Sequence, residues 1–209
     1  MRLTVFGASG GTGTHVVRRA LAARHEVVAV VREPARLALP AQAGLEVFRA
    51  DPMDAEEIFP AVDGADAVIS ALGPRGRGPT TVCSAGVRSE LQAMGKAGVS
   101  RLVVISASGA YIDAGDGPVT SMVLKPLLQR VLRESLADVR RMEDEVRSSA
   151  VDWTIMRPPQ LTNGSRRGRY RAAVDRNVGS RISRADLADA ILSALGDPAT
   201  AGHSIGVGY

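Results

Sequence analysis

The sequence predicts an α/β fold built on a doubly wound parallel sheet, with a small loop-rich excursion towards the C-terminus. Three observations favour this Rossmann arrangement. Short apolar runs rich in Val and Ile alternate with segments of helical spacing, as βαβ units require. Runs such as 102–105 are apolar throughout, which is typical of parallel strands covered on both faces. A glycine-rich turn joins the first strand to the first helix, and we expect residues 1–209 to form one domain.

The predicted elements follow one another along the chain. We expect strands at 2–6, 26–31, 45–49, 66–70, 101–106, 152–156 and 204–207, and helices at 11–23, 54–61, 80–97, 120–133, 136–149 and 184–195. Gly98 is expected to end the third helix, and Ser135-x-x-Asp138 resembles a capping box that opens the helix at 136. The stretch 158–183 breaks the alternation and is predicted to form a loop-rich excursion over one edge of the sheet.

Composition excludes several classes of protein. A hydrophobic fraction of 45% and a charged fraction of 23% argue against long disorder. The apolar run 27–31 is far shorter than the roughly 20 residues that cross a bilayer, and no signal peptide precedes the first strand. One cysteine, Cys83, cannot form an internal disulfide, and the three histidines have no metal-ligand spacing. We therefore expect a cytoplasmic protein with no metal site and no membrane association.

The positive charge indicates an anionic partner. The net charge is +4, and only two of the 26 basic residues are lysines. A phosphorylated cofactor would satisfy such a surface, as would nucleic acid, which we consider the weaker alternative. The densest basic cluster, 166–171, is interpreted as a solvated loop, with contact to an anionic electron acceptor or to nucleic acid left open.

The turn after the first strand has the spacing Gly7-x-x-Gly10-x-x-Gly13. The first glycine permits the tight turn, the second lets a pyrophosphate approach the backbone, and the third lets the helix pack closely on the strand. Free N–H groups at the helix N-terminus then face the anion. The predicted phosphate-binding residues are Gly7, Ser9, Gly10, Gly11, Thr12 and Gly13.

The end of the second strand selects the cofactor. Sites for NAD place Asp or Glu there, to accept from the 2′-hydroxyl of the ribose. This chain has Arg32 instead, and a guanidinium pairs with a 2′-phosphate, with Arg36 or Ser9 assisting. Glu33 lies one residue beyond that position. The pattern predicts NADP(H), although Arg32 as a solvated surface cation stays an alternative.

Further segments carry a family resemblance across nearly the whole chain. They are Ala50-Asp51-Pro52-Met53, Ser70-Ala71-Leu72-Gly73, Met156-Arg157-Pro158-Pro159 and the run from Ile182 to Ala188. With the glycine turn and Arg32, they resemble the atypical short-chain dehydrogenase/reductase superfamily. Within it, the chain is similar to compact NAD(P)H-binding proteins that include biliverdin reductase B-type flavin reductases and NmrA-like proteins.

The resemblance implies roles for residues at the carboxyl ends of the strands. Asp51 and its neighbour Met53 would line the adenine site. The remaining implied contacts are Ala71, Leu72 and Gly73 beside the ribose and phosphates, Ser106 near the nicotinamide, and Pro158 and Pro159 against its carboxamide side.

The catalytic Tyr and Lys four residues apart, which classical members of the superfamily use, are missing. Position 115, four residues after Tyr111, is Gly, and the helix predicted at 136–149 offers Arg141, Met142 and Glu143. This argues against alcohol dehydrogenase, epimerase and dehydratase chemistry that begins by oxidising a hydroxyl. Ser108 or Tyr111 is predicted to hydrogen-bond an acceptor, the alternatives being a turn cap and a packed ring.

Hydride transfer to a planar acceptor does not require the Tyr and Lys pair, because this reaction needs mainly orientation of the reactants and exclusion of water. We therefore expect an NADPH-dependent reductase of a flavin, a quinone or a tetrapyrrole-like molecule. The alternative is an NmrA-like sensor that binds NADP(H) without turnover. The loops 73–80, 108–120 and 158–180 are expected to bind the acceptor, and the stripe Met122, Val123, Leu127, Val131 to be core or a homodimer contact.

Overall fold

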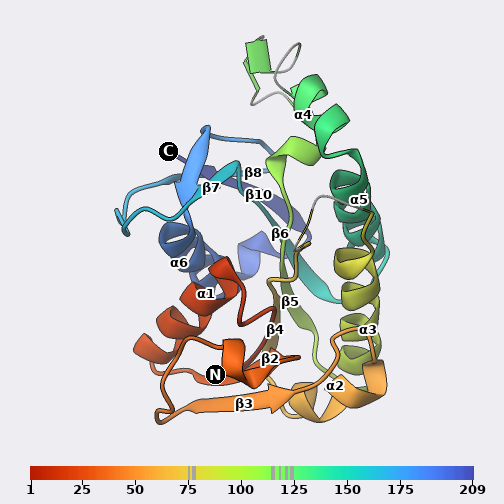
Figure 1. Cartoon of the computed structure of the whole chain (residues 1–209), viewed down its shortest axis with the longest axis vertical. Helices are drawn as coiled ribbons and strands as arrows, with labels where there is room; N and C mark the ends of the chain where they lie inside the picture. The colour runs from red at the N-terminus through yellow and green to blue at the C-terminus, as the bar shows by residue number, and fades with distance from the viewer. Residues whose placement is uncertain (75, 77–78, 114–115, 118, 121, 123–124) are drawn as a thin grey trace.

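The computed structural model describes residues 1–74, 76, 79–113, 116–117, 119–120, 122 and 125–209. A twisted eight-stranded sheet runs through the centre of the chain (Figure 1). Its order is β3 (Leu45–Arg49), β2 (Glu26–Val31), β1 (Arg2–Phe6), β4 (Ala67–Ser70), β5 (Arg101–Ile105), β6 (Asp152–Arg157), β10 (His203–Gly208) and β8 (Arg171–Val174). All neighbours are parallel except β10 and β8, which are antiparallel. The predicted doubly wound α/β fold is confirmed.

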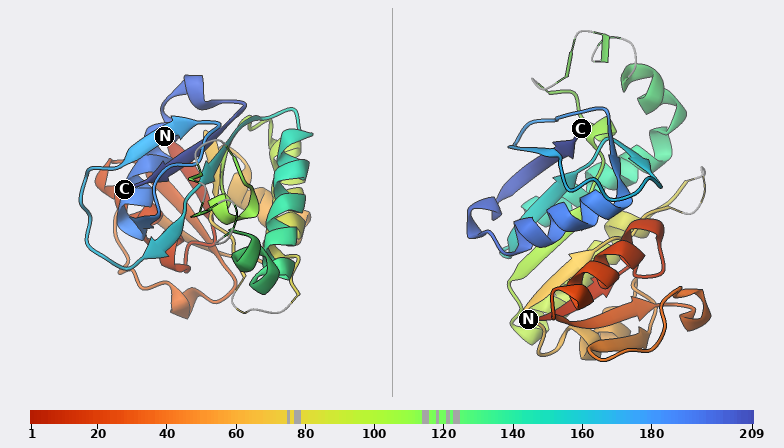
Figure 2. Two further views of the ribbon diagram at one scale, coloured as in Figure 1. Left: turned by 90° about the horizontal axis from the view of Figure 1, so that it is seen from above. Right: turned by 90° about the vertical axis from the view of Figure 1, so that its left-hand side faces the viewer.

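Helices cover both faces of the sheet. Figure 2 shows α1 (Gly11–Ala22) and α6 (Arg184–Leu195) on one side, and α3 (Val82–Ala97) and α5 (Arg133–Arg147) on the other, where α2 (Ala55–Val62) also packs. Each face has its own hydrophobic cluster, because the strands between them bury side chains in both directions. From β1 the chain adds β2 and β3 on one side of the sheet and then β4 and β5 on the other, so the strand order reverses between β1 and β4. Open α/β sheets form a ligand crevice at this point.

The predicted strands and most of the helices lie within two residues of the observed ones. Gly98 ends α3 in the left-handed conformation, with φ 69°, as expected. The helix predicted at 120–133 is represented by α4 (Lys125–Val131), and residues 121 and 123–124 of that prediction lie outside the described part. Parts of the predicted acceptor loops 73–80 and 108–120 lie outside it too.

The stretch 158–183 is loop-rich, as predicted, and it also contains three short strands. Of these, β8 joins the main sheet, while β7 (Gln160–Thr162) and β9 (Arg181–Ser183) form a parallel pair. One prediction about local structure is wrong. The predicted capping box does not form, since α5 begins at Arg133 without a side-chain cap at its N-terminus. Asp138 instead binds the start of α3.

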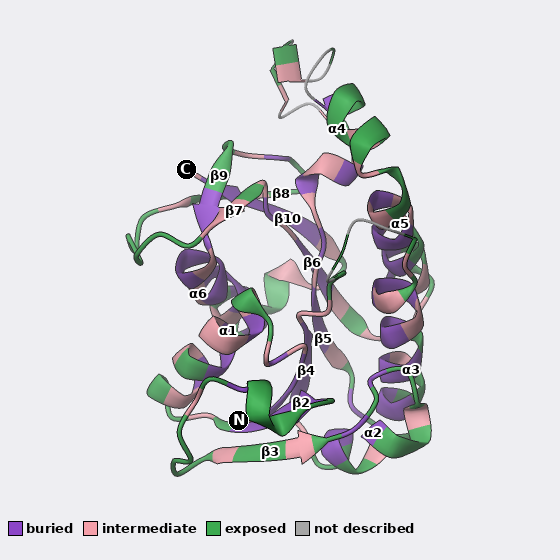
Figure 3. Cartoon of the chain, viewed as in Figure 1, coloured by how far each residue is buried: buried purple, intermediate pink, exposed green. Residues whose placement is uncertain are grey.

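Much of α4 is exposed (Figure 3). Met122, Leu127 and Val131 are 78%, 60% and 63% exposed, so the interpretation of this stripe as core is wrong within this chain. Val123 lies outside the described residues. No described helix is long and apolar enough to span a membrane.

Candidate functional site

A cleft of about 460 Å³ opens at the carboxyl ends of β2, β1, β4 and β5. Most of the predicted cofactor residues line it: Gly7, Ser9, Gly10, Gly11, Thr12, Arg32, Ala71, Leu72, Gly73 and Ser106. They come from four different turns, which the parallel sheet brings to one edge. The cleft therefore lies at the reversal of strand order, where this fold class binds ligands.

The glycine turn has the geometry that a phosphate requires. Gly7 has φ +69°, and a Cβ there would lie 2.4 Å from the carbonyl oxygen of Ala71, so both its conformation and its surroundings demand glycine. A Cβ on Gly13 would lie 2.1 Å from the carbonyl oxygen of Gly7, which shows how closely α1 approaches β1. Gly13 is buried beneath the turn and outside the cleft lining; its contribution is this close packing.

The N-terminus of α1 is open to an anion. Its N-cap, Gly10, makes no side-chain hydrogen bond, and the first turn contains no acidic residue. Backbone N–H groups and the helix dipole thus face the cleft without a competing carboxylate. Arg184, at the start of α6, also lines the cleft, and its Nε would lie 2.8 Å from a Cβ on Gly11. The guanidinium of Arg184 and the N-terminus of α1 thus line the same cleft, and both favour a phosphate anion.

A second hollow of about 520 Å³ shares Arg32 with the cleft. Arg49 lies in it as well, with Asp51 and Glu57, and the Glu57 carboxylate accepts a 2.9 Å hydrogen bond from the backbone N–H of Asp51. Two guanidinium groups at the end of β2 and β3 suit a phosphate on the adenosine ribose. Arg36 and Met53 were also predicted to bind the cofactor, but they line neither the cleft nor this hollow. Arg36 pairs with Glu33 at 3.3 Å, and the backbone N–H of Met53 donates to the Asp51 carboxylate at 3.1 Å.

Part of the cleft lining is apolar. It includes Val82, Ile105, Leu136, Val139 and Leu161. Among the described residues that line the cleft, no Asp, Glu, His, Lys or Tyr is present. Burial, followed by the nearby Asp138 carboxylate, raises the pKa of the Cys83 thiol to about 12, which keeps this lining cysteine protonated and unreactive. The described residues of the lining therefore offer apolar side chains and no carboxylate, imidazole, amine or phenol as a general acid or base.

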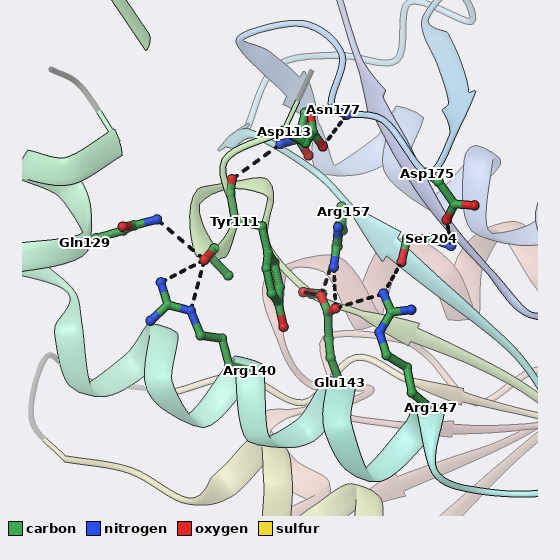
Figure 4. Close-up of polar contacts among 12 residues, drawn as sticks. Tyr111, Asp113, Gln129, Arg140, Glu143, Arg147, Arg157, Asp175, Asn177 and Ser204 are labelled. Atoms are coloured by element: carbon green, nitrogen blue, oxygen red, sulfur yellow. Dashed lines mark hydrogen bonds and ion pairs between the residues drawn. The ribbon is translucent and has the colours of Figure 1, made fainter. Parts of the chain in front are cut away.

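The predicted acceptor-binding residues lie behind the cleft lining. Ser108 is buried, and its backbone N–H donates to the carbonyl oxygen of Pro158 at 2.9 Å. The Tyr111 ring packs against Arg157, whose guanidinium carbon is 4.1 Å from the ring centroid (Figure 4). Burial and the adjacent Glu143 raise the pKa of Tyr111 to about 12. Neither Ser108 nor Tyr111 is among the residues that line the cleft, and a hydrogen bond from either to an acceptor stays a prediction.

Pro158 and Pro159 are not in the cleft lining either. Pro158 is buried beside the end of β5, and the Cγ of Pro159 would lie 3.3 Å from a Cβ on Gly208. Both prolines thus help to join the ends of β6, β5 and β10. Among the described residues, no group of three or more His, Cys, Asp and Glu side chains is arranged to hold a metal ion.

Two charged residues were missed as site residues by sequence reasoning. Arg184 belongs to the segment that carries the family resemblance, but helix periodicity gives no sign that its side chain folds over Gly11. Glu143 is fully buried on α5 and accepts from the hydroxyl of Ser106 at 2.5 Å. A charged residue on the apolar face of a predicted helix was the available signal, because such a residue is buried only with partners.

Comparison with known proteins agrees with this geometry. A family model described as NAD(P)H-binding matches residues 7–198. The uncharacterized protein YwnB of Bacillus subtilis (strain 168) is 27% identical over 209 residues, covering 95% of this chain and 93% of that protein. A 2′-dehydrokanamycin reductase of Streptomyces kanamyceticus is 32% identical over 155 residues, which are 74% of this chain and 40% of the reductase.

Solved structures share the fold over the whole chain. ChuY, an anaerobillin reductase from Escherichia coli O157:H7, is 27% identical with a TM-score of 0.74, over 99% of this chain and 97% of that one. A wide-type short-chain dehydrogenase/reductase from Veillonella parvula DSM 2008, solved with NADP, has a TM-score of 0.83 over 100% of this chain and 94% of that one. Its identity of 20% shows likeness of fold alone.

Proposed function

Because this chain belongs to the NAD(P)H-binding family, we propose that it is a cytoplasmic NADPH-dependent reductase that transfers hydride directly to a flavin, a quinone or a tetrapyrrole-like acceptor. The observation that carries the proposal is the composition of one cleft lining. It combines the open N-terminus of α1 and Arg184 with apolar side chains, and the described lining residues include no Asp, Glu, His, Lys or Tyr. The helix end with Arg184 would bind a dinucleotide, and the apolar side chains would enclose a flat acceptor.

The choice of NADPH over NADH rests on Arg32 and Arg49. Both are exposed in the hollow beside the glycine turn, and no carboxylate follows β2 at the position where a 2′-hydroxyl would be held. Arg32 forms no ion pair with any described residue, so its charge is available for a phosphate. A charge-assisted bond of this kind is worth about 1.5–3 kcal/mol, which discriminates the two cofactors by one to two orders of magnitude.

The protein's part in the reaction is orientation and exclusion of water. NADPH supplies the hydride when bound. The side chains of Val82, Leu136 and Val139 would hold a planar acceptor and keep water from the reacting atoms. Because these walls provide no proton donor, the acceptor takes its proton from solvent. The reductases among the relatives and structural neighbours support a reductase here, while their substrates belong to those proteins.

Steady-state oxidation of NADPH, followed at 340 nm with FMN, FAD, a benzoquinone and biliverdin, tests the proposal. NADH is assayed in parallel. We expect turnover with at least one acceptor and a KM for NADPH that rises about tenfold to a hundredfold in Arg32→Gln, with little change for NADH. Arg88→Gln, an exposed arginine paired with Glu145 away from the cleft, is the control.

The second candidate is a redox sensor that binds NADP(H) without turnover. The lack of an acid or base in the described lining favours it as much as it favours a simple reductase. Negligible oxidation with every acceptor, together with affinities that differ strongly between NADPH and NADP⁺, would replace the reductase with the sensor.

A further inference from the structure

A buried carboxylate stands directly behind the cleft. Glu143 has no exposed surface, and both of its oxygens accept hydrogen bonds (Figure 4). Oε1 accepts from Ser106 Oγ at 2.5 Å and from Arg157 Nε at 3.0 Å. Oε2 accepts from the terminal nitrogens of Arg157 at 2.5 Å and of Arg147 at 3.3 Å. All four contacts are donors, so the carboxylate acts only as an acceptor.

This arrangement fixes the direction of the Ser106 hydroxyl. A hydroxyl has one proton to donate and lone pairs with which to accept. Since the proton is directed at Glu143, Ser106 can only accept from a second partner. Ser106 also lines the cleft, beside Ile105 and Ala107. The side chain therefore offers the cleft an acceptor and no donor.

The position of Ser106 indicates which part of the cofactor it meets. The glycine turn after β1 binds the pyrophosphate, and the hollow at Arg32 lies over β2 and β3. The half of the dinucleotide opposite the adenosine must therefore lie over β4 and β5, where Ser106 follows β5. That half carries N–H and O–H donors, namely the nicotinamide carboxamide and the ribose hydroxyls.

We infer that Glu143 is a positioning residue that holds the Ser106 hydroxyl as an acceptor for an N–H or O–H group of the nicotinamide riboside half of the cofactor. The inference rests on the cofactor site of the proposed function and not on the acceptor. Packing alone does not explain why the charged side chain of Glu143 is buried at this position, whereas a role in cofactor binding does. The inference also excludes Ser106 as a proton donor to the reduced product.

Binding of two ligands separates this role from a merely structural one. Isothermal titration would measure NADPH and 2′-phospho-ADP, which keeps the pyrophosphate but lacks the whole nicotinamide riboside. Ser106→Ala removes only the hydroxyl and leaves the pairing of Glu143 with the arginines in place. We expect it to weaken NADPH about fivefold and to leave the fragment unchanged. Unchanged affinity for NADPH in Ser106→Ala would overturn the inference.

Variants of Glu143 test whether it acts through Ser106. Glu143→Gln offers an amide in place of the carboxylate, and Glu143→Asp keeps the charge but is one methylene shorter. We expect both to weaken NADPH selectively, and the double variant Glu143→Gln with Ser106→Ala to bind NADPH no more weakly than Ser106→Ala alone. Equal weakening of both ligands, or additive losses in the double variant, would show a structural role only. Glu145→Gln, on the same helix and paired with Arg88, is the matched control.

The binding result is independent of turnover. If no acceptor oxidises NADPH but the variants bind NADPH more weakly and the fragment normally, the reductase proposal fails and the inference about Glu143 stands. If turnover is observed while Ser106→Ala binds NADPH normally, the reductase stands and the inference fails.

Discussion

The Asp138 carboxylate on α5 accepts a 2.9 Å hydrogen bond from the backbone N–H of Cys83, at the start of α3. The same carboxylate accepts from the backbone N–H of Ser84 at 3.2 Å and from its hydroxyl at 2.5 Å. Thr81, the N-cap residue of α3, makes no side-chain hydrogen bond to the helix. The fully buried Asp138 of α5 therefore caps α3 in its place. The positive end of α3 is neutralised internally, whereas α1 presents an open N-terminus to the cleft.

Replacement of this cap should destabilise the fold. Asp138→Ala leaves two buried N–H groups of α3 without an acceptor and removes the link between α3 and α5. We expect the free energy of unfolding to fall by about 2–4 kcal/mol in urea denaturation. Asp144→Asn, exposed on the same helix, should change it by less than about 0.5 kcal/mol. A comparable loss in both variants would mean that the contact to α3 is not what matters.

The close contact of Gly13 with Gly7 should make the turn intolerant of a methyl group. In Gly13→Ala the new Cβ meets backbone on both sides and nothing flexible can yield, so NADPH binding should be lost, with destabilisation of several kcal/mol. Gly95→Ala on α3 is the control, because open space surrounds a Cβ there. That variant should be neutral or slightly stabilising, since Ala is favoured over Gly in a helix. Normal NADPH affinity in Gly13→Ala would contradict this picture of the turn.

Glu90 should make stability depend on pH. The side chain is fully buried, Ser70 Oγ donates to its Oε1 at 3.0 Å, and Oε2 has no partner among the described residues. Burial raises the pKa of Glu90 to about 8. Between its unfolded pKa and pH 8 the folded protein therefore holds a proton that the unfolded chain has released, so the free energy of unfolding falls as pH rises.

Glu90→Gln removes that titration and keeps the shape of the side chain. Relative to the variant, the wild type should lose up to about 1.4 kcal/mol of unfolding free energy per pH unit between pH 5 and pH 8. Urea denaturation at several pH values measures the difference directly. A parallel dependence on pH in the two proteins would show that Glu90 is not protonated in the fold.

Arg184 should contribute to the binding of the pyrophosphate. Its Nη1 donates to Asn163 Oδ1 at 2.6 Å, which holds the guanidinium above Gly11. Arg184→Gln should weaken NADPH and 2′-phospho-ADP-ribose by the same factor, about tenfold, because both contain the pyrophosphate. The dependence of affinity on salt should also become shallower. Arg181→Gln, an exposed arginine on β9, is the control; equal effects in the two variants would indicate a general loss of positive charge.

The order of strands and helices was predictable because buried parallel strands and amphipathic helices leave apolar patterns of different period. The glycine turn was predictable too, since the conformation of Gly7 and the close approach of Gly13 each restrict the position to glycine. The short strands β7, β8 and β9 were not, because segments such as Arg171–Val174 are only a few residues long and expose most of their side chains. What defines them is pairing with distant strands.

Long-range contacts decide where side chains near the site lie. Asp138 fits a local capping pattern, but its partner Cys83 lies 55 residues away in the chain. Ser108 and Tyr111 follow β5, and the Tyr111 ring packs on Arg157 and is not part of the cleft lining. Sequence patterns identify the turns at the edge of the sheet, while the direction of each side chain depends on partners that the patterns do not record.

Direct hydride transfer is the central claim, and a single turnover tests it most directly. The protein, loaded with NADPH carrying deuterium on one or the other face of the nicotinamide C4, is mixed with an acceptor, and oxidation is followed at 340 nm. We predict a rate several times slower for deuterium on one face and unchanged for the other, because a fixed cleft presents one face to the acceptor. Equal rates for the two labelled cofactors, or no oxidation with any acceptor, would contradict the claim.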